Sequence, residues 1–199
     1  MMNPIEVGQS YDSIADRWQA PQLSLDGLAQ HERALQFVSN RGNALDAGCG
    51  CNGRFIDLLR QRGFTVEGVD VSERMIALAR QRDPTVQFYH ADICQWEPPR
   101  KYDFITGWDS IWHVPLAAQD RVLQKLCAAL NPGGVLIFTT GGVDIPGDVQ
   151  DAHMGPPMYT AALGIPRTLE LLSDFGCICR HLEYDQHPAL HLYIVAQKI

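Results

Sequence analysis

The 199-residue chain has no apolar run long enough to cross a membrane, and its first residues lack the apolar core of a signal peptide. We therefore expect a cytoplasmic protein without membrane association. The six cysteines include no Cys-x-x-Cys pair, so the ligand spacing of a zinc site is missing from the sequence. We accordingly predict no bound metal, and we interpret the cysteines as small apolar residues in a reducing compartment.

Positive charge is scarce as well. The chain carries 16 Lys and Arg against 23 Asp and Glu, which gives a net charge of −7 at pH 7. Because binding to nucleic acid depends on clustered Lys and Arg, we expect no nucleic-acid partner. The sequence also lacks internal repeats and low-complexity tracts, and its length suffices for one domain with a sizeable core. We therefore predict a single domain over residues 1–199.

The chain does contain a regular alternation of apolar and amphipathic segments. Short apolar runs predict strands at residues 44–47, 65–70, 86–89, 102–107, 135–140, 177–184 and 190–197. Helical spacing predicts helices at residues 25–39, 54–62, 116–130 and 167–175, and one more that Ser72 caps. Strands that alternate with helices pair in parallel, whereas residues 185–189 are too short for a crossover and imply a final antiparallel hairpin. The sequence thus predicts an α/β fold, a Rossmann-like three-layer sandwich whose seven-stranded, mostly parallel sheet has an antiparallel C-terminal hairpin strand.

A glycine-rich turn follows the first predicted strand. Residues 48–53, Gly-Cys-Gly-Cys-Asn-Gly, satisfy the pattern GxGxxG, and Asp70 ends the next strand. This pattern alone is typical of NAD binding, so an NAD-dependent oxidoreductase is one hypothesis. Two details disagree with it: Asp46 would face a pyrophosphate poorly, and the terminal hairpin departs from the parallel sheet of a dinucleotide dehydrogenase.

Five blocks in order point to another cofactor. They are Leu45-Asp46-Ala47-Gly48-Cys49-Gly50, Val69-Asp70-Val71-Ser72 with Met75, Ala91-Asp92-Ile93, Tyr102-Asp103-Phe104-Ile105, and Leu130-Asn131-Pro132-Gly133-Gly134. With these blocks, residues 40–199 resemble the class I S-adenosylmethionine-dependent methyltransferases, and the helix around Tyr11 resembles that of the small-molecule type. The resemblance implies transfer of a methyl group from S-adenosylmethionine to an unidentified small-molecule acceptor. A non-catalytic module that binds the same cofactor is the other alternative.

The resemblance also implies which residues hold the cofactor. It places the amino-acid end on Asp46 and the glycine loop, the ribose on Asp70, and the adenine amino group on Asp92. The implied set is Tyr11, Trp18, Asp46, Gly48, Cys49, Gly50, Asp70, Val71, Met75, Asp92, Ile93 and Trp108. The family's third glycine falls at Asn52, a residue type that tolerates positive φ. Each of three residues also has a purely structural alternative: Asp70 as a helix cap, Asp92 as a turn residue and Met75 as a residue of the hydrophobic core.

Candidate acceptor-side residues follow the carboxyl ends of the predicted parallel strands, where ligands of such sheets bind. Methyl transfer requires mainly proximity and alignment, and a base is needed only if the acceptor loses a proton. We nominate His113 first as base or substrate ligand, with His153 and Tyr159 next. His187 and His191 are further candidates.

Two segments are expected to enclose the pocket. Residues 1–40 are predicted to form an N-terminal helical lid, and residues 141–165 a long substrate-side loop, because they are rich in Gly, Pro and Met without clear periodicity. The Asn-Pro-Pro-aromatic sequence of amide- and adenine-methylating relatives is missing after residue 107, where Trp108-Asp109-Ser110-Ile111 stands. This favours a small metabolite as acceptor. The sequence leaves a monomer and a homodimer open.

Overall fold

The computed structural model describes residues 2–19 and 26–199. The strands are β1 (Asn43–Ala47), β2 (Thr65–Asp70), β3 (Gln87–His90), β4 (Tyr102–Gly107), β5 (Leu130–Gly141), β6 (Gly147–Asp151), β7 (Met158–Ala162), β8 (Cys177–Tyr184) and β9 (His191–Lys198). The α-helices are α1 (Pro4–Ile14), α2 (Leu28–Ala34), α3 (Arg54–Gln61), α4 (Glu73–Arg82), α5 (Leu116–Ala129) and α6 (Ile165–Asp174). Short 3-10 turns are formed by Ala15–Gln19, Leu35–Phe37 and Ile111–His113.

Seven strands form one sheet in the order β3-β2-β1-β4-β5-β9-β8. Neighbours among β1 to β5 pair in parallel, whereas β9 is antiparallel to both β5 and β8. The predicted mostly parallel sheet with an antiparallel C-terminal strand is therefore confirmed. The strand order reverses between β1 and β4, and the crevice beyond the carboxyl ends of such strands is where open α/β sheets bind ligands.

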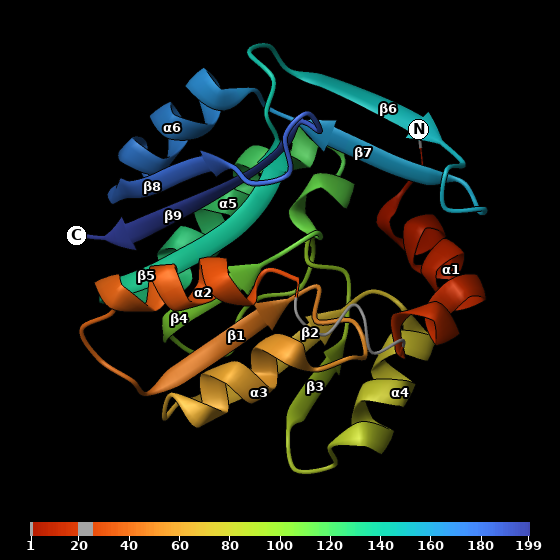
Figure 1. Ribbon diagram of the computed structural model, residues 1–199, viewed down its shortest axis with the longest axis horizontal. Helices are drawn as coiled ribbons and strands as arrows, with labels where there is room; N and C mark the ends of the chain where they lie inside the picture. The colour runs from red at the N-terminus through yellow and green to blue at the C-terminus, as the bar shows by residue number, and fades with distance from the viewer. Residues whose placement is uncertain (1, 20–25) are drawn as a thin grey trace.

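Helices cover both faces of this sheet (Figure 1). On one face, α2, α3 and α4 pack in a cluster that includes Leu59 and Phe104, both fully buried. On the other face, α5 and α6 pack around Leu126 and Ile194, also fully buried. Because β4 lies between the two clusters, all its residues are buried, as expected for a central parallel strand. The predicted three-layer sandwich is confirmed.

The glycine-rich turn leads directly into α3. Gly53 precedes the helix with φ of 68°, and the Asn52 side chain accepts a hydrogen bond from the Arg54 N–H at 3.1 Å. Gly53 therefore takes the left-handed conformation that the sequence analysis considered for Asn52. Among the described non-glycine residues, positive φ occurs only at Asp109.

Residues 141–165 are not the irregular loop predicted. Strands β6 and β7 pair antiparallel from Gly147–Ala162 to Asp151–Met158 and form a separate two-stranded sheet. In Figure 1 this hairpin projects beyond the main sheet toward α1, and β7 contacts both α1 and the turn at 111–113. The loop prediction was wrong because polar residues in β6, together with Gly and Pro around it, hide the strand alternation.

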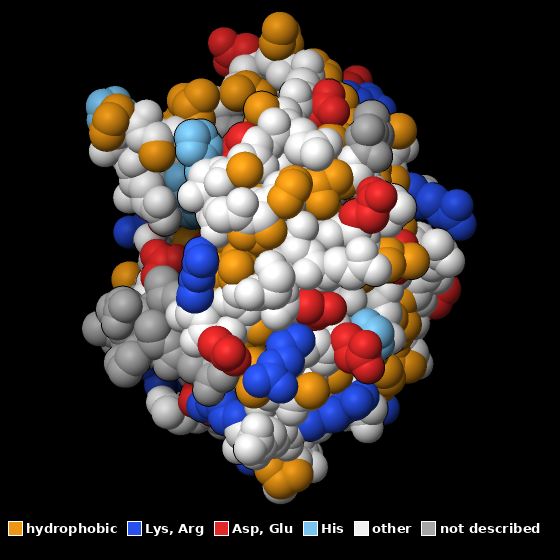
Figure 2. Space-filling view, turned by 90° about the vertical axis from the view of Figure 1, so that its right-hand side faces the viewer, with side chains coloured by type: hydrophobic (Ala, Val, Ile, Leu, Met, Phe, Trp, Pro, Cys, Tyr) orange, Lys and Arg blue, Asp and Glu red, His pale blue; other side chains and the backbone are white. Residues whose placement is uncertain are grey.

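Helix α1 packs against α4 and β7. The Asp12 carboxylate accepts hydrogen bonds from the Ser72 hydroxyl at 2.5 Å and from the Arg74 N–H at 3.0 Å. Ser72 in turn accepts from the Met75 N–H at 3.1 Å, which confirms it as the cap of α4. The face in Figure 2 intersperses Lys and Arg with Asp and Glu. Within residues 2–19 and 26–199, no helix combines the length and apolar character that crossing a bilayer requires.

Candidate active site

Two adjoining cavities open where the strand order reverses. The first cavity is lined by residues following β1, β2 and β3, and the second by residues from α3, the segment after β4 and the β6–β7 hairpin. The cavities share one wall, formed by Tyr11, Trp18, Gly48, Gly50 and His113. A ligand that crosses this wall would have one part in each cavity.

The first cavity brings together polar and apolar residues that the sequence analysis assigned to ribose and adenine. They are Asp70, Val71, Met75, Asp92 and Ile93. The Asp70 carboxylate accepts from the Gly50 N–H at 2.8 Å and from the Ser72 N–H at 2.9 Å, one on each oxygen. Burial raises the pKa of Asp70, although these backbone donors oppose the rise. The backbone thus fixes this carboxylate at the cavity wall, and each oxygen retains a lone pair for a ligand.

Three other predicted cofactor residues lie elsewhere. Cys49 and Trp108 line the second cavity rather than the first. Asp46 lines neither; its side chain is buried at the end of β1, and burial raises its pKa to about 7. The structure therefore places Asp46 beneath the glycine loop rather than in its opening.

The loop itself requires glycine at its first position. Gly48 has φ of 81°, and a Cβ added to it would lie 2.1 Å from the Cβ of Ser110. The Ser110 hydroxyl donates to the Ala47 carbonyl at 2.6 Å, which holds the segment after β4 against the loop. A Cβ added to Gly50 would meet no heavy atom within 4 Å. The loop is thus closed on its inner side by Ser110 and open at Gly50, where a ligand can approach the backbone.

His113 stands at the shared wall with both ring nitrogens occupied. Its Nδ1 lies 2.7 Å from the Tyr159 carbonyl oxygen, which can only accept, so Nδ1 carries the proton. Its Nε2 accepts from the Tyr11 hydroxyl at 2.7 Å and from the Trp112 indole N–H at 3.1 Å. Burial lowers the pKa of His113, which favours this neutral form. His113 is therefore placed to hold Tyr11, and its nitrogens are not free to act as a base.

The other nominated side chains differ in their access to the cavities. His153 is exposed and lines the second cavity. Tyr159 is buried, lines neither cavity, and accepts the Leu116 N–H at 3.1 Å through its hydroxyl. The structure thus places Tyr159 as a support for the hairpin rather than as a ligand contact. His187 is exposed and also lines neither cavity.

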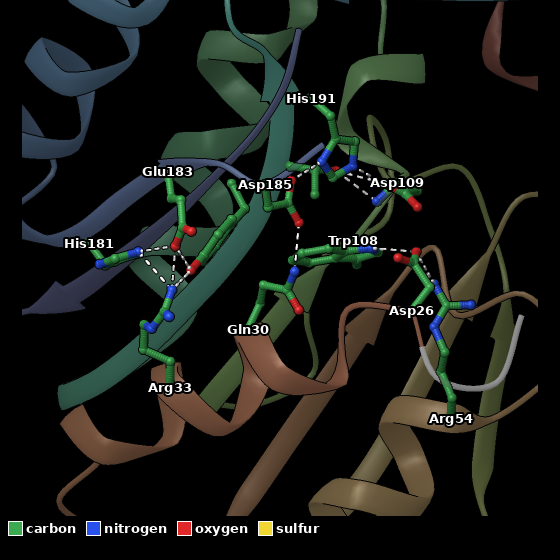
Figure 3. A network of polar contacts seen from close by, with 12 residues as sticks. Asp26, Gln30, Arg33, Arg54, Trp108, Asp109, His181, Glu183, Asp185 and His191 are labelled. Carbon is green, nitrogen blue, oxygen red and sulfur yellow. Dashed lines mark hydrogen bonds and ion pairs between the residues drawn. The ribbon is translucent and has the colours of Figure 1, made fainter. Parts of the chain in front are cut away.

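A buried histidine with two carboxylates lies behind the second cavity (Figure 3). His191 Nδ1 lies 2.5 Å from Asp185 Oδ1, and His191 Nε2 lies 2.9 Å from Asp109 Oδ1. Only Asp109 of the three lines the cavity. The sequence analysis named His191 as a candidate, but it assigned no role to Asp109 or Asp185.

Arg54 was also missed. Its side chain is 11% exposed and lines the second cavity. The guanidinium lies 4.4 Å from the centre of the Phe55 ring and 3.8 Å from the Asp26 carboxylate, yet its buried Nε has no hydrogen-bond partner among the described residues. A buried donor without a partner is costly, which indicates a position for a ligand acceptor. Arg54 begins α3 directly after the glycine turn, and this position in the sequence could have identified it as a site residue.

Comparison with known proteins identifies the family. The model of a methyltransferase domain matches residues 22–178. The chain belongs to this methyltransferase family. Trans-aconitate 2-methyltransferase of Escherichia coli is 39% identical over 85% of this chain and 73% of its own length. The ubiquinone biosynthesis O-methyltransferase of Idiomarina loihiensis is 28% identical over 70% of this chain. The chain spans only 61% of that relative and 40% of a trans-aconitate 2-methyltransferase from Delftia acidovorans.

Solved structures show the same methyltransferase fold. An S-adenosylmethionine-dependent methyltransferase from Clostridium acetobutylicum superposes with a TM-score of 0.72 at 14% identity, over 94% of this chain and 98% of that chain. A Burkholderia thailandensis 1,6-didemethyltoxoflavin-N1-methyltransferase, solved with its substrate and S-adenosylhomocysteine, gives 0.71 at 18% identity, over 100% and 91%. The family match favours the methyltransferase prediction over the NAD-dependent alternative.

Proposed function

We propose that this chain transfers a methyl group from S-adenosylmethionine to a small-molecule acceptor held in the second cavity. The observation that carries the proposal is the wall shared by the two cavities at Tyr11, Gly48, Gly50 and His113. A cofactor with its nucleoside in the first cavity and its sulfur at this wall would present its methyl group to the second cavity. The relatives named for trans-aconitate, ubiquinone biosynthesis and 1,6-didemethyltoxoflavin support a small-molecule acceptor.

The residues of the first cavity fit the nucleoside. The lone pairs that Asp70 retains suit the two ribose hydroxyls, which are donors. The Asp92 carboxylate accepts the Cys94 N–H at 2.8 Å and also interacts with the Cys94 thiol. Its remaining lone pairs suit the adenine amino group, which is a donor. Val71 and Met75 supply apolar surface for the ring.

The residues around the glycine loop fit the amino-acid end. Arg54 has a buried Nε without a partner and is the cation among the described charged residues that line the second cavity. A carboxylate there would satisfy that donor and gain a charge-assisted hydrogen bond. We therefore assign the methionine carboxylate to Arg54, in place of the role first expected for Asp46.

S-adenosylmethionine would supply a methyl group that is bonded to a positively charged sulfur. An acceptor lone pair would attack the methyl carbon in line with the carbon–sulfur bond and displace the sulfur. The chain contributes alignment and exclusion of water. Helix α1, held to α4 by Asp12, and the 3-10 turn that follows it place Tyr11 and Trp18 in the shared wall. The N-terminal helix thus acts as the lid of the site.

Calorimetry with S-adenosylhomocysteine and with NADH tests the cofactor assignment. We expect the homocysteine compound to bind and NADH not to bind. Asp70→Ala should weaken that binding by about 1–3 kcal/mol, because both ribose hydrogen bonds are lost. Asp174→Ala, which removes an exposed carboxylate at the end of α6, is the matched control. An unchanged dissociation constant in Asp70→Ala would remove Asp70 from the site. Binding without methyl transfer to any member of a metabolite panel would support the non-catalytic alternative.

A further inference from the structure

Three residues from distant parts of the chain form one polar unit behind the second cavity (Figure 3). His191 begins β9, Asp185 follows β8 and Asp109 follows β4. The His191 side chain is 8% exposed and that of Asp185 5%, whereas that of Asp109 is 35% exposed. Gln30 of α2 also donates to Asp185 at 2.7 Å. The unit is therefore buried at its His191–Asp185 end and open to the cavity at Asp109.

The geometry determines the charge of this unit. Ionised carboxylates only accept hydrogen bonds, and each ring nitrogen of His191 faces one of them. Both nitrogens must therefore carry a proton, which makes the ring a cation. Burial lowers the pKa of His191, but the hydrogen bonds to Asp109 and Asp185 and the negative charges of these two carboxylates together outweigh burial and raise the pKa to about 9. One cation between two anions gives the unit a net negative charge, and Asp109 is its member that is open to the cavity.

The backbone aims the Asp109 carboxylate. Asp109 has φ of 52°, and its N–H donates to the Thr139 hydroxyl at 2.7 Å. His191 fixes Oδ1, while no described residue donates a hydrogen bond to Oδ2. A non-glycine residue held in the left-handed region is uncommon and is often found at functional sites. The free Oδ2 is thus an oriented acceptor at the wall of the second cavity.

The remaining charges of the second cavity are also unevenly placed. Its charged side chains, apart from histidine, are Asp26, Arg54, Asp109 and Asp151 among the described residues. Arg54 is paired with Asp26, which leaves Asp109 and Asp151 to dominate the rest of the cavity. A ligand group with its own negative charge would be repelled there, whereas a neutral or cationic donor would be attracted.

We propose that Asp109 accepts a hydrogen bond from an O–H or N–H group of the acceptor, and that His191 and Asp185 are positioning residues for it. This inference rests on the proposed function and narrows its substrate class to alcohols, phenols or amines. We therefore expect polycarboxylates, the class to which the substrate named for the E. coli relative belongs, to bind poorly beside Asp109. Asp109 thereby determines which hydrogen-bond donor groups are held in the second cavity.

Three probes of one shape test the proposal. Benzylamine, benzyl alcohol and benzoate share a ring and differ in the group that would face Asp109, and trans-aconitate represents polycarboxylates. Binding is followed by the fluorescence of Trp108 and Trp112, which line the cavity. We expect benzylamine or benzyl alcohol to bind at least tenfold more tightly than benzoate and trans-aconitate. Comparing benzylamine with benzyl alcohol then shows whether the site prefers an amine or a hydroxyl group. Asp109→Asn, which tolerates the same backbone, should reduce this ratio to below threefold, whereas Asp174→Asn should leave it unchanged.

The absence of that preference, or its persistence in Asp109→Asn, contradicts the proposal. Nitrogen NMR of labelled histidine gives an independent readout: both His191 nitrogens should carry protons at pH 7, and a neutral ring would contradict the positioning role. The probes are measured with and without S-adenosylhomocysteine. If S-adenosylhomocysteine does not bind but the preference for the amine or alcohol probe remains, only the proposed function is contradicted. If S-adenosylhomocysteine binds but the preference is absent, only the role of Asp109 is contradicted.

Discussion

The two cavities hold their polar groups in different ways. In the first cavity, backbone N–H groups close in sequence hold the carboxylates: Ser72 is two residues from Asp70, and Gly50 is 20 residues from it. In the second cavity, side chains distant in sequence hold one another: Asp109 and His191 are 82 residues apart, and Tyr11 and His113 are 102 apart. The first arrangement depends on the backbone of the turns after β1 and β2, whereas the second depends on side chains from several distant elements.

Under the proposed function, this difference separates cofactor recognition from acceptor recognition. Backbone donors persist whatever side chain their residue carries, so the geometry around Asp70 is insensitive to most substitutions elsewhere. The Asp109 geometry changes with any substitution at His191 or Asp185. We therefore expect substitutions in the β8–β9 turn and the β6–β7 hairpin to alter acceptor binding without disturbing the first cavity.

We expect the largest effect from a substitution at Gly48, which should disturb both cavities at once. In Gly48→Ala the new Cβ would overlap Ser110, and the φ of 81° would disfavour alanine. Overpacking and the left-handed backbone together predict a loss of about 2–5 kcal/mol in the free energy of unfolding. We also expect S-adenosylhomocysteine affinity to fall by more than about 100-fold, because the loop lies under both cavities. Urea unfolding and calorimetry measure the two effects.

Gly63→Ala is the matched control. Gly63 has φ of 92°, but a Cβ there would meet no heavy atom within 4 Å. We expect only the backbone cost of about 1–2 kcal/mol and unchanged cofactor affinity. Equal losses in both variants would show that Ser110 yields to the added Cβ.

The sequence predicted the main sheet well because short segments rich in apolar residues, separated by helical patterns, mark its central strands. Strands β2, β4 and β8 have the predicted bounds. Strand β5 begins at Leu130 instead of residue 135, because Leu130 already pairs with Tyr102 before a register shift. The turn residues 131–134 thus lie within a strand, and a local turn signal cannot show that pairing.

The candidate site was predicted unevenly for the same reason. Asp70 ends β2 and Asp92 follows β3, and both lie in the short blocks that carry the family resemblance, which assigned them to the cofactor. Asp109 also follows a strand, but its role depends on His191, which local sequence cannot place beside it. The β6–β7 hairpin was missed because β7 is ordered by packing against α1 and the turn at 111–113 rather than by its own pattern.

The pH dependence of stability compares His191, behind the second cavity, with Asp46, beneath the glycine loop. The folded-state pKa of His191, about 9, exceeds its ordinary value of 6.5. Its stabilisation is therefore fully present below pH 6.5 and is lost as the pH rises to about 9. That difference is equivalent to about 3 kcal/mol. His191→Asn should remove this slope from urea unfolding between pH 6.5 and 9.5, and His153→Asn, an exposed control, should retain it.

Asp46 should affect the free energy of unfolding in a lower pH range than His191. Burial raises its pKa from 3.8 to about 7, so the unfolded chain releases this proton first and stability falls between about pH 4 and 7. Asp46→Asn should remove the slope in that window and leave the His191 window intact. A single transition that both variants abolish would mean that the two regions titrate as one unit.

The smallest expected effect lies at the junction of the two cavities. Tyr11→Phe removes the hydroxyl that donates to His113 Nε2 but retains the ring, whose edge packs on Trp18 at 5.4 Å between centroids. One hydrogen bond of this kind contributes about 0.5–1.5 kcal/mol, so methyl transfer should slow roughly two- to tenfold. Because Asp70 and Asp92 keep their contacts, S-adenosylhomocysteine affinity should change less. Tyr184→Phe, which removes a 3.0 Å bond to the Gly142 carbonyl outside both cavities, should affect neither. An equal loss of cofactor affinity and rate in Tyr11→Phe would mean that the hydroxyl serves the first cavity as much as the second.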